Sequence, residues 1–139
     1  MKVDLTGIVE DGTPRGPGVP ADPRTTISTP QGSTVSLHVQ VLRSCGAPVN
    51  LDGEGIGLVL SIGSRSWPYQ VPPYVEKVAT IMDAAHGRAE FNLGPGCLWL
   101  MHPGQYAYDI WLTYGGARYD IIPASAWMVL ASVARVPRS

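Results

Sequence analysis

The chain has 139 residues and a formal net charge of −1; 45% of its residues are hydrophobic and 15% are charged. This length fits one domain with a sizeable core, and no cluster of basic residues indicates a nucleic-acid partner. No run approaches the roughly 18 apolar residues of a membrane-spanning helix, and no signal-peptide pattern follows Met1. The charged fraction is well under the roughly 25% typical of soluble domains, which suggests a surface partly covered by other protein.

Residues 1–32 are rich in proline and glycine, with five of each. Because proline fixes φ and removes a backbone donor, residues 13–30 are predicted to lack regular structure, whereas residues 3–9 could form a short strand. We therefore expect residues 1–32 to be an extended N-terminal arm held by a neighbouring chain, to whose exposed sheet edge residues 3–9 could add a strand. The predicted contact residues of this arm are its apolar ones: Val3, Leu5, Ile8, Val9 and Ile27.

Period-two alternation of apolar and polar residues predicts strands through the rest of the chain, which is expected to form one domain over residues 33–139. The clearest pair flanks Gly115-Gly116, where a two-residue turn with positive φ would join two strands into a hairpin. No segment has the pattern of a convincing helix. The predicted strands cover residues 35–41, 56–62, 78–82, 88–93, 106–113, 119–122 and 127–133.

Seven short strands separated by turns predict two antiparallel sheets packed face to face. Burial of about a dozen inward side chains, at about 1.5–3 kcal/mol each, would offset much of the ordering entropy, so no disulfide is needed. Cys45 and Cys97 are expected to be reduced in a chain without an export signal, and the sequence leaves open whether they approach each other.

The sequence predicts no catalytic, cofactor or metal site. His38, His86 and His102 never fall in the spacing of metal ligands, and no Gly-x-Ser-x-Gly elbow marks a nucleophilic serine. Cys97 has no basic neighbour that would activate its thiol, so a buried structural thiol is the better interpretation. We therefore expect a protein that is not an enzyme.

Aromatic residues gather in a proline-rich loop over residues 63–77. Trp67, Tyr69 and Tyr74 are candidates for contact with a neighbouring subunit, and two alternatives stay open: packing over the domain's own edge, or a stacking platform for sugar. Trp111 is a further candidate for partner contact, because strand alternation points it away from the face of Ile110.

One stretch, Leu-Met-His-Pro-Gly-Gln-Tyr-Ala-Tyr-Asp-Ile-Trp-Leu-Thr at residues 100–113, leads into a glycine turn and a last strand. Together with Gly-Ala-Pro-Val-Asn-Leu-Asp-Gly at residues 46–53, this pattern resembles the small immunoglobulin-like domains of tailed-bacteriophage virions. The resemblance covers about residues 33–134. It implies an immunoglobulin-like antiparallel β-sandwich of about seven strands, with Tyr106 as a tyrosine corner whose hydroxyl binds nearby backbone.

The resemblance also implies assembly rather than chemistry. Such a protein would be a capsid decoration or cement protein, or a tail or baseplate component, of a virion assembled in the host cytoplasm. Its partners would be major capsid or tail proteins and further copies of itself, with neither nucleic acid nor membrane. The alternative from a different class is a carbohydrate- or cell-surface-binding β-sandwich module, which coplanar aromatic residues on one open face would favour.

Overall fold

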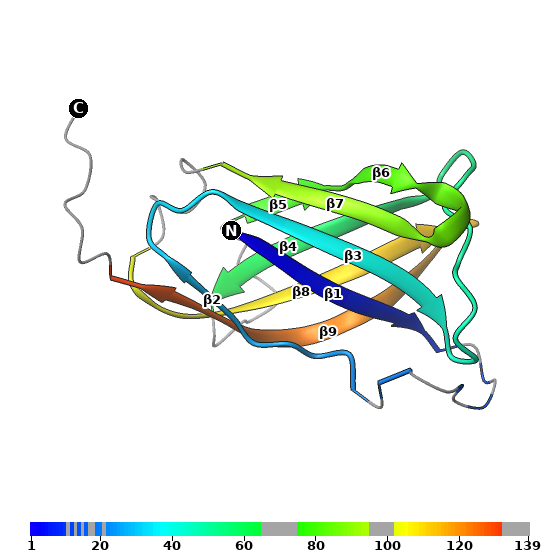
Figure 1. The fold of residues 1–139 in the computed structure, drawn as a ribbon, viewed down its shortest axis with the longest axis horizontal. Helices are drawn as coiled ribbons and strands as arrows, with labels where there is room; N and C mark the ends of the chain where they lie inside the picture. The colour runs from blue at the N-terminus through cyan, green and yellow to red at the C-terminus, as the bar shows by residue number, and fades with distance from the viewer. Residues whose placement is uncertain are drawn as a thin grey trace.

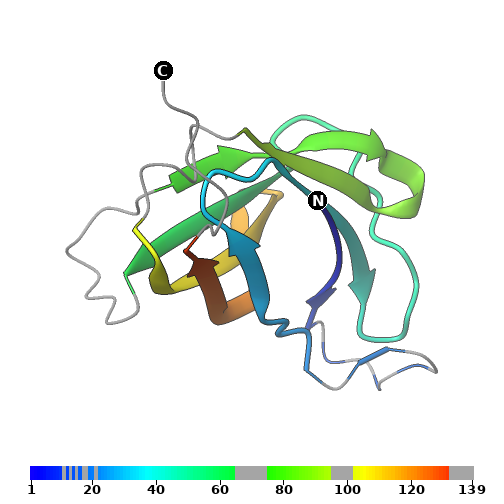
Figure 2. The same ribbon diagram turned by 60° about the vertical axis from the view of Figure 1, so that its left-hand side comes forward.

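The computed structural model describes residues 1–10, 12, 14, 16, 19–20, 22–64, 75–94 and 102–131. These residues form nine strands in two sheets that pack face to face, as Figures 1 and 2 show. One sheet has four strands in the order β1-β3-β7-β6, and the other has five strands in the order β2-β9-β8-β4-β5. The predicted all-β sandwich is therefore confirmed.

The strands, in chain order, are β1 (Lys2–Val9), β2 (Ile27–Pro30), β3 (Val35–Arg43), β4 (Gly57–Ser64), β5 (Val75–Val78), β6 (Thr80–Asp83), β7 (Arg88–Leu93), β8 (Gly104–Tyr114) and β9 (Ala117–Leu130). A short 3-10 helix, η1 (Ala84–His86), connects β6 to β7. The chain changes sheets between β5 and β6, where the N–H of Ala79 donates to the carbonyl of Leu58 at 3.0 Å. This crossing closes one side of the sandwich.

The hairpin of β8 and β9 is the longest antiparallel pair among the described strands, and it forms as predicted. Gly115 and Gly116 occupy its tip with φ angles of 58° and 80°, the left-handed values that a two-residue primed turn requires. Past the register shift near Tyr108, β9 continues through Pro123 to Leu130. Two predicted strands, at residues 119–122 and 127–133, are therefore parts of one long strand as far as Leu130.

Proline is tolerated inside β9 because Pro123 lies in an irregular stretch of the ladder. The pairing with β8 goes from Ser125 opposite Tyr108 to Ile122 opposite Ile110, and β2 pairs only with residues 127–130, so Pro123 has no register partner on either side. The sequence pattern indicated a break at this point, because proline normally ends a strand. The structure places a local irregularity there instead.

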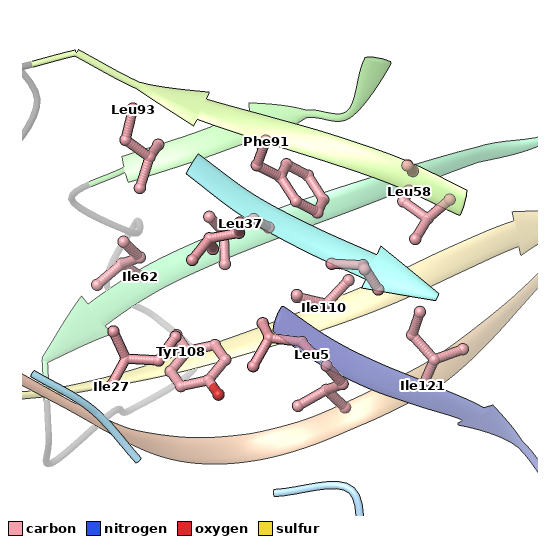
Figure 3. Close-up of a cluster of buried hydrophobic side chains, with 14 of the residues drawn as sticks. Leu5, Ile27, Leu37, Leu58, Ile62, Phe91, Leu93, Tyr108, Ile110 and Ile121 are labelled. Atoms are coloured by element: carbon pink, nitrogen blue, oxygen red, sulfur yellow. The ribbon is translucent and has the colours of Figure 1, made fainter. Parts of the chain in front are cut away.

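The core lies between the two sheets and is built from the inward residues of every long strand (Figure 3). β3 shows the principle: its buried positions alternate strictly with half-buried ones from Val35 to Val41. Ile110 of β8 and Phe91 of β7 enter this core from opposite sheets and are almost fully buried. Each such side chain contributes about 1.5–3 kcal/mol when removed from water.

The prediction that residues 1–32 form an arm outside the sandwich is wrong. β1 lies beside β3 and pairs with it in parallel, from Lys2 opposite Ser36 to Val9 opposite Arg43. β2 pairs in parallel with the end of β9. The two sheets are consequently mixed rather than wholly antiparallel, and the sandwich begins at Lys2. The physical reason is that the apolar residues of this segment are removed from water when they pack on the core of their own domain, whereas an extended arm would leave them exposed.

β2 is held by polar contacts as well as by burial. The Tyr108 hydroxyl donates a hydrogen bond to the carbonyl of Thr25, just before β2. The indole N–H of Trp127 donates to the hydroxyl of Thr29 at 2.9 Å. The two rings pack edge to face with centroids 5.6 Å apart, a favourable aromatic geometry. A four-residue strand is thus fixed at both of its ends.

Candidate interaction surfaces

Trp111 lies on the outer face of the five-stranded sheet, as strand alternation predicted. It stands opposite Val59 of β4 on one side and Asp120 of β9 on the other. The guanidinium carbon of Arg118 lies 4.0 Å from the centroid of the indole ring, within the range of a cation–π contact. Arg118 also lies 3.6 Å from a carboxylate oxygen of Asp120. The indole is therefore partly covered by a charged side chain of its own sheet.

Asp109 lies two residues before Trp111 on the same face, opposite Ser61 of β4. Burial raises the pKa of its carboxyl above the ordinary value of 3.8, Asp120 raises it further, and Arg118 lowers it. Its Oδ1 atom is buried and has no hydrogen-bond partner within the described part of the chain. This outer face thus carries a carboxylate that is costly to ionise.

The outer face of the four-stranded sheet is hollowed over a volume of about 510 Å³. Its floor is a row of polar side chains at matching register positions: Asp4 of β1, His38 of β3 and Glu90 of β7. The imidazole Nε2 of His38 lies 3.8 Å from a carboxylate oxygen of Glu90. Thr6, Gln40 and Arg88 form the next row. The face can offer hydrogen bonds and charges of both signs to a partner.

A second, smaller hollow of about 240 Å³ lies at the hairpin end of the sandwich. Tyr114 and Tyr119 flank the glycine turn and are both more than a third exposed. Leu112 and Val49 form the apolar floor of this hollow, and Arg43 adds a positive charge to its lining. The shape and composition fit a protruding apolar side chain of another protein.

The most exposed large apolar side chains of the described residues lie where β5 crosses to β6. Val78 is 73% exposed and Met82 is 60% exposed. Both strands are outermost strands of their sheets. Val78 pairs with Val59 on the outer face of the five-stranded sheet, and Met82 lines the hollow on the outer face of the four-stranded sheet, so each sheet has one large exposed apolar side chain near this crossing. The sequence pattern did not reveal this surface, because the alternation of residues 75–83 does not show where the chain changes sheets.

The apolar residues predicted to touch a partner through the arm lie largely inside this molecule. Leu5 is 4% exposed and Ile27 is 2% exposed, both within the core between the sheets. Ile8 is 1% exposed, and Val3 and Val9 are partly buried and pack against the core. The prediction that Leu5, Ile8 and Ile27 contact a partner is therefore wrong, because the three side chains are buried within this chain. Trp67, Tyr69 and Tyr74 lie outside the described residues.

Two of the three histidines make close contacts with acidic side chains, His38 with Glu90 and His86 with Asp83. His38 points outward from β3, and His86 lies in η1 with its Nδ1 2.8 Å from a carboxylate oxygen of Asp83. Within the described ranges no three side chains of the metal-ligating types come together. Cys45 is an exposed free thiol, and Cys97 lies outside the described residues. No helix in the described part of the chain is long and apolar enough to span a membrane.

Comparison with known proteins adds little at the level of sequence. No protein-family model matches the chain, and no curated protein matches it. Among solved structures, the chain is similar to the N-terminal domain of phage TP901-1 ORF48, with 13% identity and a TM-score of 0.47 over 94% of this chain and 98% of that one. It is also similar to rusticyanin from Thiobacillus ferrooxidans, with 16% identity and a TM-score of 0.40 over 92% and 77%. With such low scores, the fold assignment rests on the strand pairing described above.

Proposed function

We propose that this chain is a non-enzymatic structural protein of a tailed-phage virion, either a capsid decoration protein or a tail or baseplate component. Its sandwich would serve as a rigid body and its exposed edges and loops as contact surfaces. The major capsid protein or a tail protein would be the docking partner.

The observation that carries the proposal is the exposure of Val78 and Met82 on β5 and β6, which follow each other in the chain and are outermost strands of different sheets. Leaving two large apolar side chains in water at a sheet edge is unfavourable for an isolated protein and invites aggregation. Burial against a partner removes both costs. A low charged fraction of 15% over the whole chain fits a molecule that works in a crowded assembly.

The resemblance to virion domains supplies the kind of assembly. The Pro-Gly-x-Tyr segment at the start of β8 folds as that resemblance implies, with the hydroxyl of Tyr106 donating to the carbonyl of His102 at 2.6 Å. This tyrosine corner pins the entry to β8. It supports a structural role for Tyr106, and it also occurs in sandwiches of other functions.

A sugar-binding module is the competing function, and the arrangement of the aromatic residues that the structure describes favours it less. Trp111 carries Arg118 over its ring, whereas Tyr114 and Tyr119 stand at the far tip of the hairpin. These rings do not share one open face. Among the residues that the structure describes, no Trp, Tyr or Phe on which a sugar could stack lines the polar hollow on the four-stranded sheet.

Particles of the phage that encodes this chain provide the test. Immunogold labelling with an antibody against the chain should decorate intact particles at fixed positions on head or tail. Val78→Glu should lower incorporation into particles, whereas Glu76→Gln on the same strand should not, because Glu76 already presents a polar, exposed side chain. Unlabelled particles, together with glycan binding by the isolated protein, would favour the sugar-binding alternative.

A further inference from the structure

The outer edge of β1 is open along its first part. The carbonyl of Met1 accepts a hydrogen bond from the N–H of Ser36 at 2.8 Å, which fixes the phase of the parallel ladder. In such a ladder alternate residues bond to the neighbouring strand, so the peptide groups of Lys2, Asp4 and Thr6 point away from β3. Among the described residues no other backbone group bonds to them. These are unpaired donors and acceptors at a sheet edge.

The other outermost strands are protected in ways that β1 is not. β2, β5 and β6 have only four residues each. β2 also places Pro30 on its outer edge, where no N–H can be offered, and β6 is interrupted by a register shift between Ile81 and Asp83. β1 has eight residues, without proline or bulge. Among the outermost strands that the structure describes, β1 is therefore the longest and the most regular.

The charges of β1 select one way of pairing it with a second copy of itself. In a two-fold antiparallel pair, outward peptide groups must face outward peptide groups, so even-numbered residues stand opposite even-numbered ones as hydrogen-bonded pairs, and odd-numbered residues stand opposite odd-numbered ones between them. Centring the pair on Lys2 or on Asp4 brings like charges together, which is unfavourable. Centring it on Val3 places Lys2 opposite Asp4 of the second copy, twice. A pair centred on Leu5 would place Lys2 opposite Ile8 of the second copy, and Ile8 is already buried within its own chain.

The inner side of β1 is complementary in the same register. Met1 is 57% exposed and Val3 is only partly buried, although both lie on the apolar side of the strand. With Val3 on the two-fold axis, Met1 would lie opposite Leu5 of the second copy, and the apolar layer would continue across the interface. The charged side and the apolar side of β1 thus favour the same arrangement.

We propose that this chain self-associates through β1, as a two-fold antiparallel pair centred on Val3 that joins the four-stranded sheets of two copies into one. The pairing uses the peptide groups of Lys2 and Asp4 as hydrogen-bonding partners and their side chains as cross-strand ion pairs. It depends only on the geometry of this edge, so it stands or falls independently of the proposed role in a virion.

Sedimentation equilibrium of the whole chain, over a wide range of concentrations, measures this association. Lys2→Glu and Asp4→Lys each place like charges across the pair and should weaken dimerisation on the order of tenfold. The exchanged double variant Lys2→Asp/Asp4→Lys should restore it, which a general effect of charge would not do. Glu76→Lys, a charge reversal at an exposed position of β5, is the control and should leave the dimerisation constant unchanged.

Asp4→Pro tests the hydrogen bonds separately. The N–H that it removes points away from β3, so the variant should keep its own ladder and its circular dichroism spectrum while losing the dimer. A wild-type chain that stays monomeric at all concentrations would overturn the proposal. So would a dimer whose strength is the same in Lys2→Glu, in Asp4→Lys and in the exchanged variant, because the association would then use another surface.

Discussion

The indole nitrogen of Trp127 and the hydroxyl oxygen of Thr29 are 2.9 Å apart, although 98 positions separate the two residues in the chain. The hydrogen bond lies in the buried interior, where Thr29 and Trp127 are both fully enclosed. It joins the proline-rich N-terminal segment to the last described strand. β2 is therefore part of the core structure rather than a tail that rests on it.

Thr29→Val should destabilise the protein by about 1–3 kcal/mol, because it keeps the shape of the side chain but leaves the Trp127 N–H buried without a partner. Urea unfolding followed by tryptophan fluorescence measures the change. Ser28→Ala, on the exposed face of the same strand, should stay within about 0.5 kcal/mol of the wild type. Equal effects of the two changes would show that the hydrogen bond does not hold β2.

Period-two alternation was enough to find the strands that bury one face and expose the other. In β3, β7 and β8 one face is buried and the other meets solvent, so the pattern is visible in the residues themselves. β1 and β2 pair in parallel with strands that are distant in sequence, and nothing local specifies such partners. The proline and glycine residues around β1 and β2 were therefore the main local signal, and they led to the prediction of an extended arm.

The contact surfaces were harder to predict than the strands. The outward position of Trp111 follows from alternation alone. The exposure of Val78 and Met82 depends on the crossing of the chain from one sheet to the other at Ala79, which is a property of the tertiary structure. The open edge of β1 likewise becomes visible only once β3 is known to be its neighbour.

Ile110→Ala should cost about 2–5 kcal/mol, because the side chain is fully buried between the sheets and its loss leaves a cavity. Thr113→Ala lies on the outer face of the same strand and should cost much less. Thermal unfolding of both variants, followed by circular dichroism, compares them. If both were equally harmless, the assignment of the inward face of β8 would be wrong.

Gly115→Val should destabilise the hairpin by roughly 1–3 kcal/mol, because a β-branched residue avoids the φ of 58° that this turn position adopts. Gly57→Val is the matched control: Gly57 begins a strand, its φ is not positive, and no atom lies within 4 Å of an added Cβ. The measurement is the midpoint of urea unfolding. A loss of stability at Gly57 as large as that at Gly115 would remove the conformational explanation.

Asp109→Asn should make the protein more stable at neutral pH. Burial raises the pKa of Asp109 in the folded state above its value in the unfolded chain. The protonated form therefore stabilises the folded protein fully at a pH below the unfolded-state pKa, and this stabilisation is lost as the pH rises through the folded-state pKa. Asparagine cannot ionise and escapes this loss. The difference in the free energy of unfolding between variant and wild type should therefore shrink as the pH is lowered toward about 3. Asp52→Asn, at an exposed loop position, should show no such gain.

Removal of residues 1–30 should leave a chain that does not fold. The deletion takes away β1 and β2, and with them Leu5 and Ile27 of the core and the Thr29 acceptor of Trp127. Exposing the apolar faces of β3 and β9 would add to the loss, which exceeds the usual margin of about 5–15 kcal/mol for a domain. A smaller version of the same test is Leu5→Ala, with an expected cost of about 2–5 kcal/mol, against Lys2→Ala on the exposed side of β1. Far-ultraviolet circular dichroism and a thermal scan of the truncated chain decide the matter: a cooperative transition like that of the full chain would mean that β1 and β2 only decorate a sandwich that is stable without them.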